Sequence, residues 1–190
     1  MKIVNIYTDG ACSGNQNEEN IGGWGCILEY GEHIKELNGG EVNTTNNRME
    51  LSALIAGLAA LKEKGLQVNV YSDSSYLINC FKNKWYENWQ KNGWKTASKA
   101  PVENRELWEE LLSLMQGQSV SFSLVKGHLT LSNETAMKAA HKKYCEHNGK
   151  ISFEQFRYIA EKNHRADELA TTFQREMANI GTLCLTIEKM

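Results

Sequence analysis

The 190-residue sequence lacks the features of membrane proteins, secreted proteins and disulfide-rich scaffolds. No apolar run approaches the roughly 18 residues that a membrane-spanning helix needs. The N-terminal stretch MKIVNIYTDG does not resemble the long apolar region of a signal peptide. The five cysteines are scattered and form no CxxC pair, which argues against a disulfide framework and against a cysteine-based zinc site. We therefore predict a cytoplasmic protein that makes no membrane contact.

A strong net charge is also absent. The formal net charge is −2 at pH 7, so the chain as a whole does not indicate a nucleic-acid partner. One segment differs, because residues 82–99 contain five lysines and a single acidic residue, Glu87, together with Trp85, Trp89 and Trp94. Lysines interleaved with aromatic side chains are typical of a surface that binds a nucleic-acid backbone, although clustered tryptophans more often belong to a core.

The patterns that are present predict a single α/β domain with a mixed sheet. Hydrophobic residues make up 41% of the chain and charged residues 23%, as in globular proteins of this length. Helices are expected in TTNNRMELSALIAGLAALKEKG, SSYLINCFKN and ENRELWEELLSLMQG, where apolar residues recur at helical spacing. Strands are expected at residues 2–8, in GGWGCILEY and EHIKELNGG around a Gly31-Glu32 turn, in LQVNVYSD and in SVSFSLVKGH.

Two of the predicted strands end in a carboxylate, Asp9 and Asp73. Glu50 lies within the first turns of the long helix, and Asp167 is expected at the start of a last helix. Each has a structural explanation as a turn or a helix cap, and periodicity alone does not place the four around one point. If they converge, they repel one another unless a divalent cation binds between them. Ligation by oxygen alone suits Mg²⁺ or Mn²⁺.

Five ordered motifs, YTDGACSGN, TTNNRMEL, VYSDSSYL, VKGH and RADELA, resemble type 1 ribonuclease H of the bacterial kind that carries a handle region. The resemblance implies a ribonuclease H-like fold, a five-stranded mixed sheet flanked by helices on both faces. It also implies endonucleolytic hydrolysis of the RNA strand of RNA–DNA hybrids with two Mg²⁺ ions, which Mn²⁺ can replace, giving 5′-phosphate and 3′-hydroxyl products. Asp9, Glu50, Asp73 and Asp167 are the implied catalytic metal ligands. His128 is implied to assist proton transfer or product release.

The same resemblance implies a surface for the hybrid. An enzyme that cuts only RNA must sense 2′-hydroxyl groups, for which short polar side chains and backbone amides are suited. The segment at 82–99 resembles the basic handle, whose lysines would neutralise phosphates. Ser75 stands where the family commonly has a longer glutamine. The expected substrate contacts are Gly10, Cys12, Asn15, Thr45, Asn46, Asn47, Ser75, Trp85, Trp89, Lys91 and Trp94.

The region between His128 and Asp167 departs from the family pattern. These two residues are 39 positions apart (167 − 128), whereas family members usually bridge them with a short loop. We predict a ribonuclease H domain at 1–175 with a helical insertion at about 131–162. Residues 176–190 are predicted to form an extension packed on the same domain. Its alternating apolar residues would also fit an added edge strand or an oligomer contact.

Alternative functions stay open at this point. The chain could be a non-catalytic or gated module that binds RNA–DNA hybrids, although a pure binder gains nothing from a repulsive acidic cluster. The fold would also suit DNA transposition or junction cleavage. A calcium-regulated interaction protein has weak support, because YCEHNGKISFEQF lacks the key carboxylates of an EF-hand loop. We expect a monomer whose partner is an RNA–DNA hybrid duplex, with no obligate protein partner.

Overall fold

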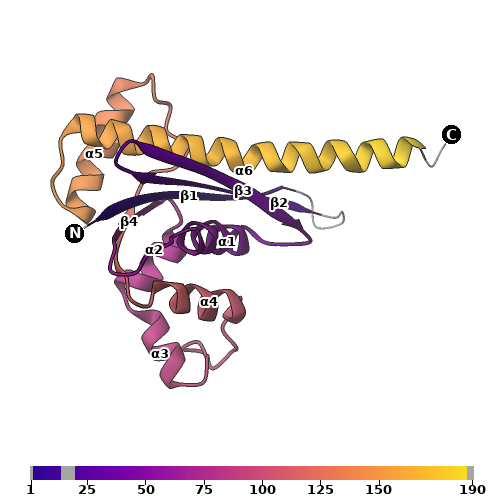
Figure 1. Ribbon diagram of the computed structural model, residues 1–190, viewed down its shortest axis with the longest axis horizontal. Helices are drawn as coiled ribbons and strands as arrows, with labels where there is room; N and C mark the ends of the chain where they lie inside the picture. The colour runs from indigo at the N-terminus through magenta and orange to yellow at the C-terminus, as the bar shows by residue number, and fades with distance from the viewer. Residues whose placement is uncertain (1, 14–19, 188–190) are drawn as a thin grey trace.

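The structure, a computed structural model, describes residues 2–13 and 20–187, the side chains at 178 and 180–187 excepted. A layer of helices covers each face of a central sheet (Figure 1). The strands are β1 (Ile3–Ser13), β2 (Ile21–Tyr30), β3 (His33–Val42), β4 (Gln67–Ser72) and β5 (Ser119–Leu124). The helices are α1 (Asn46–Ala59), α2 (Ser75–Lys82), α3 (Trp85–Lys91), α4 (Arg105–Met115), α5 (Glu134–Asn148) and α6 (Phe153–Ile187).

The sheet is mixed and five-stranded, in the order β3-β2-β1-β4-β5. Strands β1, β2 and β3 form an antiparallel meander, whereas β4 and β5 run parallel to β1. Tyr30 pairs with His33 across a two-residue turn in which Gly31 has φ 59°, a conformation that glycine adopts without a steric penalty. The predicted fold class and the predicted hairpin are therefore confirmed.

Two apolar cores lie on opposite faces of the sheet. One is formed with α1, α2 and α4 and includes the fully buried Trp108, which packs on Phe81 and Tyr76. The other lies under α5 and α6 and contains Tyr7, Phe156 and neighbouring side chains. Because both faces of the sheet are covered, β1 and β4 are buried in the middle of the domain. Residues on these central strands are consequently held in fixed positions.

Helix α6 differs from the predicted last helix. It starts at Phe153 and continues without a break to Ile187, so Asp167 lies in its interior and not at its start. Residues 131–162 hold α5 and the first turns of α6. The alternating apolar residues near the C-terminus are helical and form no edge strand, and Figure 1 shows this end of α6 running past the sheet. No helix in the described part of the chain combines the length and apolar character needed to cross a membrane.

Candidate active site

Asp9 lies inside β1 and not at its end, which corrects the sequence-based prediction. The strand continues to Ser13 because β1 pairs with β2 through Asp9↔Gly25 and beyond. Its parallel pairing with β4, however, stops at Thr8↔Ser72. Asp9 is thus the first β1 residue past the end of β4, where the sheet leaves room beside the strand. The backbone N–H of Gly10 donates to Asp9 Oδ1 at 2.7 Å and fixes the carboxylate.

Glu50 reaches Asp9 because α1 packs unusually close to β1. A Cβ atom at Gly10 would lie 2.5 Å from the Glu50 backbone nitrogen and 2.7 Å from the Met49 carbonyl carbon, so only glycine permits this contact. Asn46 Nδ2, one turn earlier, donates to Glu50 Oε1 at 3.4 Å. The other carboxylate oxygen, Oε2, is buried and has no hydrogen-bond partner among the described residues.

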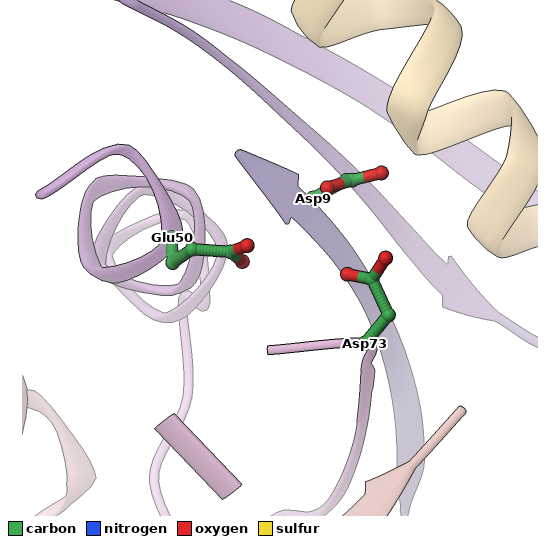
Figure 2. A group of neighbouring side chains, drawn as sticks. All are labelled: Asp9, Glu50 and Asp73. Atoms are coloured by element: carbon green, nitrogen blue, oxygen red, sulfur yellow. The ribbon is translucent and has the colours of Figure 1, made fainter. Parts of the chain in front are cut away.

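Asp73 follows β4 directly and completes a compact cluster. One ligand oxygen from each of Asp9, Glu50 and Asp73 lies within 4.8 Å of the other two. Figure 2 shows the carboxylates of Glu50 and Asp73 turned into the space next to Asp9. A Cβ atom at Gly127 would overlap Asp73 Oδ2, so the loop after β5 approaches this carboxylate with its backbone. Asp73 Oδ1 is buried without a hydrogen-bond partner in the described part of the chain.

Asp167 and His128 line the same cavity, which has a volume of about 430 Å³. Asp167 comes from α6, whose backbone packs directly on β2, since Cβ atoms at Gly23 and Gly25 would overlap the carbonyl oxygens of Ala170 and Ala166. The His128 side chain is 78% exposed, and its Nδ1 lies 3.9 Å from Asp167 Oδ2. His128 has φ 50°, a left-handed conformation that is uncommon for a side chain other than glycine.

The cluster is electrostatically strained without a cation. Burial, followed by repulsion from Asp73 and Asp167, raises the pKa of Asp9 to about 8. Burial also raises the pKa of Glu50 well above its ordinary value, and repulsion from Asp73 and Asp9 adds to it. The pKa of Asp73 is raised chiefly by burial and lowered in part by His128. Such carboxylates release their protons readily only when positive charge is supplied.

Some of the predicted substrate contacts line the cavity beside the carboxylates, and others do not. Thr45 is the N-cap of α1, and its side chain accepts a hydrogen bond from the Arg48 backbone N–H at 3.3 Å. Its side chain therefore has a structural role as a helix cap. Asn15 lies outside the described residues. The predicted contacts that line the cavity beside the carboxylates are Gly10, Cys12, Asn46, Asn47 and Ser75.

The handle consists of α3 and the loop that follows it, and it projects from the body of the domain (Figure 1). Trp85 is 39% exposed, whereas Trp94 is only 8% exposed. Trp94 packs against Trp89, which in turn packs edge-on against Trp108. Trp94 and the half-buried Trp89 thus contribute to packing, whereas Trp85 and Lys91 are exposed at the surface. Contact of Trp89 and Trp94 with the hybrid stays a prediction.

Sequence reasoning missed the glycines that assemble the site. Gly25 and Gly127 bring α6 and the loop after β5 into contact with the acidic cluster. The glycine in VKGH and those in GGWG are visible in the sequence. Their signal was weak, since glycine is also a common turn residue and only the fold shows what would occupy the Cβ position.

Comparison with known proteins gives consistent matches. The RNase H family model matches residues 1–145. A ribonuclease H of Clostridium botulinum is 56% identical over 128 residues, which cover 67% of this chain and 85% of that protein. One of Syntrophomonas wolfei is 52% identical over the same length, covering 67% of this chain and 86% of that protein.

Among solved structures, LC9-RNase H1, described as a type 1 RNase H with the type 2 active-site motif, matches with a TM-score of 0.60. It is 30% identical, and the match covers 82% of this chain and 80% of that chain. The fold and the buried carboxylates thus define an α/β domain of the ribonuclease H type with a site suited to a divalent cation. The chain belongs to the ribonuclease H family.

Proposed function

We propose that this protein hydrolyses the RNA strand of RNA–DNA hybrids in a reaction that requires divalent cations, with Asp9, Glu50, Asp73 and Asp167 as metal ligands. The observation that carries the proposal is the convergence of the buried Asp9 and Glu50 and the half-buried Asp73 beside an open cavity that Asp167 also lines. Mg²⁺ is the expected cation, with Mn²⁺ as a substitute, because all of the donors are carboxylate oxygens.

The residues present fit such a cation. Glu50 Oε2 and Asp73 Oδ1 are buried without hydrogen-bond partners among the described residues, and buried polar atoms are rarely left in this state. A cation would satisfy both oxygens and offset the burial and the repulsion that together raise the pKa of Asp9. A bound pair of Mg²⁺ ions supplies an activated water and stabilises charge on the leaving 3′ oxygen.

The protein's own groups would orient the substrate and handle protons. Gly10 N–H and the Asn46 side chain hold two carboxylates in place. Asn47 and Ser75 line the cavity at the starts of α1 and α2, where short polar groups suit contact with 2′-hydroxyls. His128 is exposed beside Asp167, where one of its ring nitrogens could transfer a proton to or from a product oxygen. The handle would contact the DNA strand through Trp85 and Lys91.

The test compares one labelled RNA–DNA hybrid with RNA–RNA and DNA–DNA duplexes of the same sequence, in Mg²⁺ and in chelator. We expect cleavage of the hybrid's RNA only, with 5′-phosphate and 3′-hydroxyl ends, and none in chelator. An intact hybrid in both Mg²⁺ and Mn²⁺ would overturn the enzyme proposal. Tight binding without cleavage would instead support a gated hybrid-binding module.

A further inference from the structure

Helix α5 and the two residues after it give the inserted region a local positive charge. Residues 134–150, ETAMKAAHKKYCEHNGK, contain four lysines and two glutamates, whereas the whole chain has a net charge of −2. The family model ends at residue 145, inside this helix. The inner face of α5 is apolar, with Met137, Ala140 and Tyr144 buried in the core that it shares with α6. Its outer face is left for solvent or for a ligand.

The position of α5 is fixed with respect to the sheet. Asn148, its last residue, accepts a hydrogen bond from Leu124 N–H at 3.1 Å and donates one to Leu124 C=O at 3.1 Å. This side-chain amide thereby satisfies a backbone pair on the outer edge of β5. Lys82 Nζ at the end of α2 donates to Asn148 Oδ1 at 2.9 Å. Helix α5 is consequently held between the edge strand and the helix that leads into the handle.

A series of adjoining hollows connects the acidic site to α5. The cavity of the carboxylates shares Asp9, His128 and Asp167 with a small hollow that Lys126 also lines. Lys126 in turn lines a groove of about 170 Å³ together with Lys143 and His147 of α5. Lining residues shared between neighbouring hollows therefore lead from the acidic site to the basic residues of α5.

The lysines on this path are available to a ligand. Lys126 and Lys143 are exposed and form no salt bridge with the residues that the structure describes. Lys138, on the same helix, is instead paired with Glu134 at 2.8 Å and lines none of these hollows. Unpaired lysines spaced along a groove are suited to successive phosphates of a nucleic-acid backbone, whose binding releases counterions.

We propose that α5 extends the substrate site, and that Lys126, Lys143 and His147 bind the phosphodiester backbone of the hybrid beyond the cleavage position. This inference rests on the proposed function. The partner is a nucleic-acid duplex because Lys126 lines both this groove and the hollow beside the proposed cleavage site, and because Lys126 and Lys143 form no salt bridge among the described residues. The insertion thus lengthens the stretch of duplex that the protein binds.

The test measures hybrid affinity as a function of salt for the wild type, Lys126→Gln/Lys143→Gln and Lys138→Gln, in Ca²⁺ to prevent turnover. Each lost phosphate contact reduces the slope of log K against log salt by about 0.9. The double variant loses two proposed phosphate contacts, so we expect the magnitude of its slope to fall by about 1.8. The slope of Lys138→Gln should stay at the wild-type value. Lys143→Arg keeps the charge and is expected to keep the slope. Thermal melting of each variant checks that it is folded.

A second arm uses hybrids shortened one base pair at a time from either end. Shortening the duplex from the end that lies on α5 should weaken binding by the wild type. The same shortening should leave binding by the double variant unchanged, because that variant already lacks the contacts with this end. Equal slopes, or equal dependence on length, would overturn the role of α5. If the wild type cleaves hybrids while these slopes are equal, only this inference fails. If the wild type neither binds nor cleaves hybrids, the proposed function fails with it.

Discussion

At the scale of single residues, the site depends on carboxylates that are costly to ionise. Asp9 and Glu50 are each only 4% exposed, and nothing in the described chain supplies a positive charge to compensate both. A buried, unpaired carboxylate favours its protonated form. The metal-free protein and the metal-bound protein should therefore respond to pH in opposite ways.

Stability of the metal-free protein should fall as pH rises. The pKa of Asp9 is about 8 in the folded protein, whereas it is about 3.9 in an unfolded chain. Between these values the folded state binds more protons, so the free energy of unfolding decreases with pH. Replacing Asp9 by Asn removes this burden, and we expect a gain of about 1–3 kcal/mol at pH 8. Urea denaturation in chelator at pH 5 and pH 8 measures the effect.

Two comparisons make this pH experiment specific. Added Mg²⁺ should restore wild-type stability at pH 8 far more than at pH 5, because the ligands must be deprotonated. Glu168→Gln, at an exposed position next to Asp167, should lack the stabilising effect of Asp9→Asn. A metal-free wild type that is more stable at pH 8 than at pH 5 would speak against the assigned burial of Asp9.

At the scale of elements, backbone contacts at glycine set where α6 lies. We predict that Gly25→Ala pushes α6 off β2, since the new Cβ would overlap the Ala166 carbonyl oxygen. Overpacking of this kind costs about 1–3 kcal/mol, and the displaced Asp167 should slow hybrid cleavage as well. Chemical denaturation and single-turnover cleavage are the two measurements. Gly31→Asn, in an open turn with φ 59° that asparagine tolerates, is the control and should leave cleavage unchanged.

Two tryptophan substitutions in the handle should affect hybrid binding and protein stability differently. Trp85→Ala should weaken hybrid binding with little change in unfolding free energy, because this side chain is 39% exposed. Trp94→Ala should cost about 3–5 kcal/mol of stability, as is usual for a buried tryptophan. Filter binding of the hybrid and thermal melting distinguish the two effects. Equal loss of stability in both variants would contradict the assigned exposures.

The elements also show what the sequence could predict. Strong periodicity and turn residues indicated all five strands and α1, and the ordered motifs pointed to the carboxylates that meet. The continuation of β1 through Asp9 was not predictable, because it depends on pairing with Gly25 of a different strand. The burial of Trp94 was missed for the same reason, since its partner Trp89 packs on the distant Trp108.

At the scale of the whole molecule, the handle and α5 lie on opposite sides of the sheet (Figure 1). Local sequence signals could not place Asp167 inside α6, because the insertion joins the helix that carries Asp167 to a new N-terminal segment. The insertion and the sheet share one apolar core, which contains Phe156 and Met137 from the inserted part and Tyr7 from β1. The insertion is therefore packed on the strand that carries Asp9.

The measurement that tests the account most directly is single-turnover cleavage of one RNA–DNA hybrid by four single variants and one control. Asp9→Asn, Glu50→Gln, Asp73→Asn and Asp167→Asn each remove one proposed ligand, and we expect a rate loss of at least about 100-fold in each. Glu168→Gln should cleave at the wild-type rate. A variant of the cluster that retains wild-type cleavage in Mg²⁺, or a Glu168 variant as inactive as Asp167→Asn, would contradict the proposed metal site.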